Sequence, residues 1–166
     1  MVTPTTGMVV GNSMIQLDII HPSQAYLASN TSVSEGTTKG VLGATTTTRD
    51  PNDFSVVTIL RFGDFDALFT GDISPEVINN LIAGGKLKDV EYIKIPHHGS
   101  KNGLTNDLLE ASMPEIAVIS VGKNQWGHPH KEVLDMLKEH DAVVMRTDET
   151  GDVIIETNGE AWKILN

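Results

Sequence analysis

The sequence predicts a single α/β domain, and three observations carry that prediction. Apolar runs of strand length alternate with helical segments between residues 54 and 147. Two short alternating runs follow, at 152–157 and 160–165, and suit a closing antiparallel hairpin. The chain has 166 residues, of which 39% are hydrophobic and 20% are charged, which is an ordinary composition for one domain with its own core.

The strands are predicted from apolar runs that end at turn residues. We expect them at 14–20, 54–62, 66–70, 90–95, 115–121 and 142–147. The dipeptide Gly63-Asp64 separates the second and third of these runs by a length that favours a tight hairpin turn. The early part of the predicted sheet is therefore antiparallel at this point.

The helices are predicted from capping residues and apolar spacing, at 75–83, 106–112 and 129–140. Ser74 is placed as an N-cap before Pro75, and Gly84-Gly85 ends that helix. In the last helix, four apolar residues fall on one stripe, which indicates its core-facing side; they are Val133, Leu134, Met136 and Leu137.

Residues 31–52 show neither a helical nor an alternating period and are rich in Thr, Ser and Gly. This composition predicts a long flexible surface loop. Loops of this length in compact domains are either lids and binding loops or disordered segments, and both interpretations stay open.

Composition limits the chemistry. There are 22 acidic and 12 basic residues, so the net charge of -10 disfavours nonspecific binding to nucleic acid, although bound metal ions could still attract a phosphate locally. The chain has no cysteine, which leaves His, Asp and Glu as the strong metal ligands. No apolar run reaches the length of about 18 residues that a membrane helix needs, so no transmembrane segment is expected.

Three predicted strands end in polar turns that contain glycine. The turns are Gly71-Asp72, the segment "PHHGS" at 96–100, and the segment "GKNQWGHPH" at 122–130. In open α/β sheets, ligands bind outside the carboxyl ends of the strands, so these turns should meet in one crevice. A carboxylate together with several imidazoles suits a divalent metal ion.

Each of these residues also has a structural interpretation. Asp72 could be an ordinary loop carboxylate near a helix N-terminus, and His97 and His98 could be surface residues. His128 could simply precede a helix that begins at Pro129, with His130 solvated in its first turn. The coincidence of three matching strand ends favours the functional interpretation. The other two histidines, His21 and His140, are expected to be structural.

Four segments resemble a known family in their order along the chain. They are "SVVTILRFGDFDALFTGDI", "IKIPHHGSKNG", "VGKNQWGHPHKEVLDML" and "VMRTDETGDVIIETNG", and "IQLDIIHPSQ" matches less closely. Together they resemble the later part of metallo-β-lactamase-fold hydrolases, and most closely the soluble domain of the DNA-internalisation competence protein (ComEC-type) family. The ordered combination of TGD, HHGS and GHP is specific, whereas each piece alone is weak.

The resemblance implies roles for six residues. Asp72 would bridge two metal ions and His98 would bind the second ion. His97 would lie beside the ions and contact or protonate a substrate phosphate. Adjacent residues near a strand end tend to point to different sides, which would let one imidazole bind metal while the other faces substrate. Three further residues would support the reaction from the substrate side, namely His128 as a catalytic residue and Ser100 and Asn102 as substrate-binding residues.

The chain departs from that family in one important respect. The fold normally begins with a half that carries a His-x-His-x-Asp-His loop, and only His21 precedes Asp72 here. The segment "HPHKEV" at 128–133 is superficially similar, but Glu132 and Val133 replace the last two ligands. We therefore expect residues 1–166 to form the C-terminal portion of the αββα sandwich, without its N-terminal half.

The expected function follows from this resemblance. The parent domain would use two divalent ions, Zn or Mn, to hydrolyse phosphodiester bonds, with DNA as one candidate substrate. This chain alone would bind metal weakly or not at all, and it would be inactive or nearly so. One alternative is a small phosphoester hydrolase of the phosphorylcholine type. Another is a noncatalytic interaction fragment, which would associate with the missing half or with copies of itself through an exposed sheet edge. The resemblance places the parent outside the cytoplasm or attached to a membrane.

Overall fold

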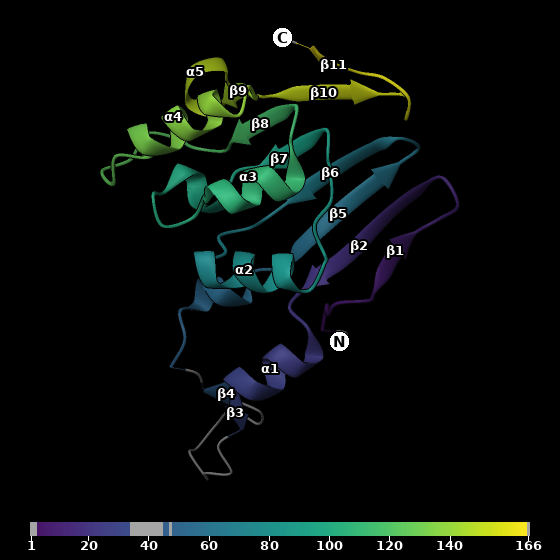
Figure 1. The fold of residues 1–166 in the computed structure, drawn as a ribbon, viewed down its shortest axis with the longest axis vertical. Coiled ribbons are helices and arrows are strands. Elements are labelled where there is room, and N and C mark those ends of the chain that lie inside the picture. The colour runs from purple at the N-terminus through teal and green to yellow at the C-terminus, as the bar shows by residue number, and fades with distance from the viewer. Residues whose placement is uncertain (1–2, 34–44, 47, 166) are drawn as a thin grey trace.

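The computed structural model describes residues 3–33, 45–46 and 48–165, and its central element is a seven-stranded sheet (Figure 1). The strand order is β1-β2-β5-β6-β7-β8-β9. The strands of this sheet are β1 (Val9–Gly11), β2 (Ile15–His21), β5 (Val57–Phe62), β6 (Phe65–Phe69), β7 (Tyr92–Lys94), β8 (Ile116–Ile119) and β9 (Val143–Arg146).

The sheet has an antiparallel part and a parallel part that meet at β6. Neighbouring strands from β1 to β6 are antiparallel, and β6 to β9 are parallel. The predicted turn at Gly63-Asp64 joins β5 to β6, because Phe62 pairs directly with Phe65. The carboxyl ends of the four parallel strands therefore lie at the same edge of the sheet.

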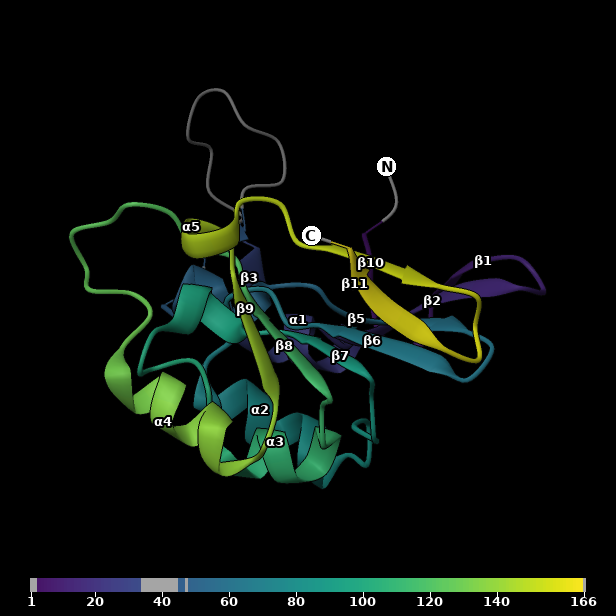
Figure 2. The same ribbon diagram turned by 90° about the horizontal axis from the view of Figure 1, so that it is seen from above.

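Three helices cover one face of the sheet: α2 (Pro75–Ala83), α3 (Asn106–Ser112) and α4 (Lys131–Glu139) (Figure 2). Between them and the sheet lies the hydrophobic core. Its fully buried members include Leu68 and Ile93 from the strands, and Ile78, Leu108 and Leu137 from the helices. Burying side chains of this size contributes about 1.5–3 kcal/mol each, so these contacts fix the helices on the sheet.

A separate hairpin of β10 (Ile154–Thr157) and β11 (Trp162–Leu165) lies on the opposite side of the sheet from those helices (Figure 2). The backbone N–H of Asp64 donates to the carbonyl of Gly159 at 2.5 Å, and the indole N–H of Trp162 donates to Glu115 at 2.9 Å. Gly63 allows this close approach, since a Cβ there would lie 2.5 Å from the Gly159 oxygen.

Most predicted elements are present, with shifts at their ends. The helices at 75–83 and 106–112 have the predicted bounds, but α4 begins later than predicted because His130 is its N-cap. The prediction that Pro129 begins the helix is therefore wrong. The elements that were not predicted from the sequence include β1, α1 (Gln24–Asn30) and α5 (Thr147–Thr150).

The predicted loop at 31–52 is partly structured. Thr31 is the C-cap of α1, and β3 (Ser32–Val33) pairs with β4 (Thr45–Thr46). A 3-10 helix, η1 (Pro51–Phe54), follows, and the side chain of its N-cap Asp50 accepts from the N–H of Asn52. The rest of that prediction, at 34–44 and 47, lies outside the described residues. The mixed α/β arrangement matches the sequence prediction, and its assignment to part of an αββα sandwich stays a prediction.

Candidate functional site

The turn after β6 positions Asp72. The buried hydroxyl of Thr70 donates to the Lys94 carbonyl at 2.7 Å and ties this turn to β7. Gly71 has a φ of +61°, and a Cβ there would lie 2.7 Å from the Cβ of Ser55. The N–H of Asp72 donates to the Ser55 hydroxyl at 3.2 Å. The glycine thus permits a turn that brings the Asp72 carboxylate over the end of the neighbouring strand.

The turn after β7, η2 (Pro96–Gly99), holds two adjacent histidines in the left-handed backbone region. The φ angles are 49° for His97 and 55° for His98. Each non-glycine residue in this region costs about 1–2 kcal/mol, so neighbouring contacts must hold the turn in place. One such contact is the hydrogen bond from the N–H of His97 to the Gly71 carbonyl, at 3.2 Å, which links the two turns.

The His98 ring lies between Asp72 and the end of β8. Its Nδ1 is 2.6 Å from the Ser120 carbonyl oxygen. A carbonyl can only accept, so Nδ1 carries the proton and the neutral ring has a free lone pair on Nε2. That Nε2 lies 3.7 Å from Oδ2 of Asp72. A backbone carbonyl that fixes the tautomer in this way is the usual support of a metal-binding histidine.

Lys94 is a neighbour of Asp72 that was not identified from the sequence. Its Nζ is 3.8 Å from Oδ1 of Asp72 and donates to the carbonyls of Gly71 and Ile95, at 3.2 and 3.3 Å. Burial lowers the pKa of Lys94, and the Asp72 carboxylate opposes that shift. A lysine inside the apolar run "VEYIKI" was the signal that could have revealed it.

The loop after β8 is organised by a single side chain, Asn124. Its amide nitrogen donates to the carbonyls of Gly122 and His128, at 2.9 and 2.8 Å. Its amide oxygen accepts from the N–H groups of Trp126 and His128, at 3.1 and 3.0 Å. These four hydrogen bonds hold the loop in one shape, and that shape leaves Trp126 72% exposed.

The loops after β7 and β8 bring three imidazoles together. The ring centroids of His97 and His128 are 5.9 Å apart, and those of His128 and His130 are 5.0 Å apart. Burial is the main cause that lowers the pKa of His128, and the nearby rings of His130, His97 and His98 lower it further. His130 was expected to be solvated, but it is half-buried and its Nδ1 is buried without a hydrogen bond, so that expectation is wrong.

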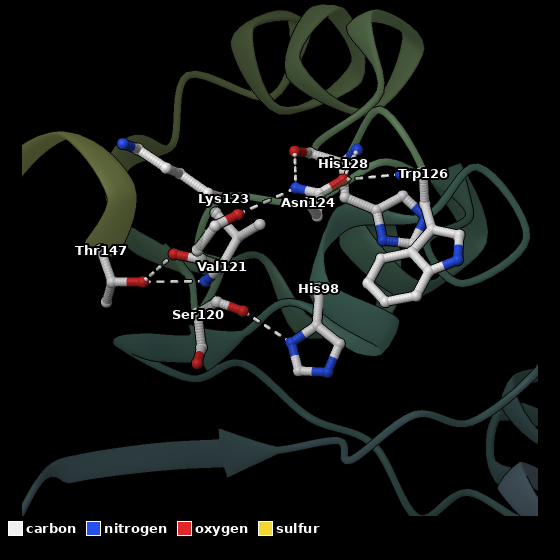
Figure 3. Close-up of a pocket in the computed structure, with 9 residues that line it drawn as sticks. His98, Ser120, Val121, Lys123, Asn124, Trp126, His128 and Thr147 are labelled. Carbon is white, nitrogen blue, oxygen red and sulfur yellow. Dashed lines mark hydrogen bonds between the residues drawn. The ribbon is translucent and has the colours of Figure 1, made fainter.

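A pocket of about 370 Å³ lies against His98 and the loop after β8 (Figure 3). The rings of Trp126 and His128 stand side by side on one wall, and Val121 and Thr147 lie on the other (Figure 3). The full lining is His98, Ser120, Val121, Gly122, Lys123, Asn124, Trp126, His128 and Thr147. Asp72 is not part of this wall and lies beyond His98, so the pocket adjoins the Asp72–His98 pair rather than enclosing it.

The two predicted substrate-binding residues lie in the turn that follows the histidines. Ser100 is only 5% exposed, and its hydroxyl accepts from the N–H of Asn102 at 3.3 Å. Asn102 is exposed, and neither residue lines the pocket. Ser100 therefore stabilises the turn, whereas the Asn102 side chain is accessible.

Neither of the two histidines predicted to be structural lines the pocket. His21 is buried, and its Nε2 is 2.8 Å from the carbonyl oxygen of Asp53. Burial lowers the pKa of His21, and the contact with Asp53 opposes the shift. His140 is the C-cap of α4.

Asp72 and His98 suit one edge of a metal coordination shell. Two ligand atoms on one tetrahedral zinc ion lie about 3.3 Å apart. The observed distance of 3.7 Å between His98 Nε2 and Asp72 Oδ2 would therefore have to shorten by a few tenths of an ångström on metal binding. Within the described part of the chain, no group of three or more His, Asp or Glu side chains is arranged to hold a metal ion. An ion at this pair would need further ligands from other residues or from water.

Among the described helices, none has the length and apolar character to cross a bilayer.

Comparison with known proteins finds similarity to three bacterial proteins. The chain is 32% identical to ComE operon protein 3 of Bacillus subtilis over 103 residues and 34% identical to Recombination protein 2 of Haemophilus influenzae over 107 residues. It is 32% identical to Competence protein ComA of Neisseria gonorrhoeae over 105 residues. These alignments cover 61%, 64% and 61% of the chain.

The similarity concerns a small part of each relative. The chain spans 13%, 13% and 15% of the lengths of these three proteins. No protein-family model matches the chain. The strand ends that gather Asp72, His98 and His128 thus belong to a chain that is similar to one segment of a competence protein, of a recombination protein and of a ComE operon protein.

Proposed function

We propose that this chain carries part of a metal-dependent phosphodiester hydrolase site, of the metallo-β-lactamase type, in a competence protein that handles DNA. The observation that carries the proposal is the pairing of Asp72 with a His98 ring whose Nδ1 is fixed by the Ser120 carbonyl. The resemblance of the TGD, HHGS and GHP segments and the names of the relatives support it.

Asp72 and His98 would hold the metal, with Zn²⁺ or Mn²⁺ as the candidate ions. A divalent ion bound there would lower the pKa of a bound water and supply a hydroxide for attack on phosphorus. The described residues provide fewer ligands than such a site needs, so we expect weak metal binding by this chain and little or no hydrolysis.

The imidazoles next to the pair would act on the substrate. The ring centroids of His97 and His128 are 5.9 Å apart, which is close enough for both rings to face one phosphate group. The lowered pKa of His128 favours the neutral form of this ring, which can donate one hydrogen bond and accept another. In this proposal His128 positions the phosphate or exchanges a proton with it, and His97 contacts it from the opposite turn.

Metal titration tests the metal-binding part of this proposal. Isothermal titration calorimetry with Zn²⁺ or Mn²⁺ should show weak binding to the chain. Asp72→Asn and His98→Gln should each weaken it by about tenfold or more, since each removes one ligand. His140→Gln is the matched control, because His140 caps α4 away from the pair. Binding that is equal in the wild type and in both site variants would refute the metal site.

Hydrolysis assays test the substrate. The chain should show at most slow metal-dependent cleavage of a chromogenic phosphodiester or of DNA. If missing metal ligands cause the low activity, adding a polypeptide taken from a part of a relative that does not align with this chain should raise the cleavage of DNA. Turnover of phosphorylcholine with no action on DNA would favour the alternative of a small phosphoester hydrolase.

A further inference from the structure

We propose that Trp126 is a stacking platform for a nucleobase of single-stranded DNA, next to the site where the phosphate would bind. The inference deepens the function proposed above and rests on it for the position of the phosphate. It assigns a role to a residue that the metal site itself does not use.

The first observation is that Trp126 is exposed by a fixed loop. Trp126 has 72% of its surface in solvent, so the flat face of its indole is accessible to a ligand. The Asn124 amide makes four hydrogen bonds within this loop, in one of which it accepts from the backbone N–H of Trp126. These bonds hold the backbone that carries the indole, so stacking on it would cost little ordering of the loop.

The second observation is the place of the indole in the pocket. Trp126 and His128 stand on one wall with ring centroids 6.3 Å apart and an angle of 32° between the rings, and His98 lies on the same pocket (Figure 3). A nucleotide whose phosphate contacts His128 and the metal-binding edge of His98 would therefore place its base beside the indole. Stacking on an aromatic face accepts every base, because each base has a π-face.

The third observation decides between a base and a cationic group. An exposed tryptophan also attracts quaternary ammonium groups. However, none of the described residues that line the pocket is acidic, and they include Lys123 and two histidines. Such a lining suits an anion with an aromatic part better than a cation. The net charge of -10 opposes contacts along a long phosphate backbone, so the affinity must come from one or two nucleotides at this pocket.

Tryptophan fluorescence tests the inference directly, because the chain has two tryptophans and the other, Trp162, lies in the β10–β11 hairpin. In a Trp162→Phe background, the emission reports Trp126 alone. With Zn²⁺ present, a short oligothymidylate should quench this emission, and an abasic oligodeoxyribose phosphate of equal length should quench it much less. Phosphorylcholine should leave it unchanged.

Binding measured by a fluorophore on the oligothymidylate completes the test. Trp126→Ala should weaken binding about tenfold, whereas Trp126→Phe should keep most of the affinity, because a smaller aromatic ring still stacks. The abasic strand should bind both variants equally. Trp162→Phe is the matched control and should bind like the wild type.

The outcomes separate this inference from the proposed function. Equal affinity for the thymidylate and abasic strands, no binding of the thymidylate strand, or an unchanged affinity in Trp126→Ala would overturn the stacking role. Quenching by phosphorylcholine instead of by oligothymidylate would overturn it in favour of a cationic ligand. If the abasic strand still binds in a way that needs Asp72 and His98, only the stacking inference fails. If the preference for the thymidylate strand needs Trp126 but is unaffected by Asp72→Asn or His98→Gln, the metal site alone is refuted and the stacking role stands.

Discussion

Individual residues at the strand ends are held in costly conformations by tight contacts. His97 and His98 both have positive φ angles, and Gly99 follows with a φ of +79°. The chain passes so close to the loop after β8 that a Cβ on Gly99 would lie 2.6 Å from the Cβ of Pro129. The N–H of His130 donates to the Gly99 carbonyl at 3.0 Å, so this contact joins the two histidine loops.

Substitution of Gly99 by alanine should therefore destabilise the protein through both strain and overpacking. Gly85→Ala is the matched control, because Gly85 has a φ of +60° but a Cβ there would meet no atom within 4 Å. We expect Gly85→Ala to cost about 1 kcal/mol of unfolding free energy and Gly99→Ala about 1–3 kcal/mol more. Urea unfolding measures the free energy of unfolding of both variants. Equal losses would show that Pro129 moves aside for the new methyl group without an energetic penalty.

The buried histidine His21 should make stability depend on pH. Burial lowers its pKa in the folded protein, so the unfolded chain binds more protons as the pH falls below about 6.5. Stability is therefore full above that pH and decreases as the pH falls toward the folded pKa. His128, whose pKa is also lowered but which is more exposed, contributes in the same direction.

His21→Gln removes the titrating group and keeps a donor for the Asp53 carbonyl. The free energy of unfolding should then fall less steeply between about pH 6.5 and pH 5 than in the wild type. Urea unfolding at a series of pH values measures this slope. An unchanged slope would mean that His21 does not contribute to it.

At the scale of elements, the loop between β8 and α4 depends on one asparagine rather than on regular structure. Asn124 bonds four backbone groups, and α4 starts only after His130, which caps it without a side-chain hydrogen bond. The position of Trp126 and His128 therefore follows from local hydrogen bonds in the loop, while α4 itself is fixed by the burial of Val133 and Leu137.

Asn124→Ala should loosen this loop while leaving the helix in place. We expect a loss of about 1–3 kcal/mol in unfolding free energy, because several backbone groups lose their partner. In a Trp162→Phe background, the fluorescence anisotropy of Trp126 should fall. Asn79→Ala, on the exposed surface of α2, is the control and should change neither quantity appreciably. Unchanged anisotropy in Asn124→Ala would show that other contacts hold the loop.

At the scale of the whole molecule, the sheet has two edges, β1 and β9 (Figure 1). Edge strands leave backbone groups free to pair with another chain. On β1, Val9 and Val10 are each 57% exposed, so this edge also presents apolar side chains. Association through an exposed sheet edge, one of the alternatives from the sequence, stays a prediction.

Sedimentation velocity over a range of protein concentrations tests that association. If β1 is the contact, Val10→Lys should shift the distribution toward the monomer, because a charged side chain on an edge strand opposes pairing. Val143→Lys on β9, where Val143 is 48% exposed, tests the other edge in the same way. A clean monomer for the wild type would remove the support for an interaction fragment.

The sequence alone predicted the α/β class, the Gly63-Asp64 turn and the helices α2 and α3, because apolar period, turn residues and caps are local signals. It also identified the three strand ends, since residue type and topology predict where ligands gather. Only the tertiary structure placed Lys94 beside Asp72, His130 beside His128, and Ser100 inside its turn. These contacts depend on how the left-handed turn at His97-His98 and the Asn124 loop fold against each other, and no periodicity along the chain encodes that packing.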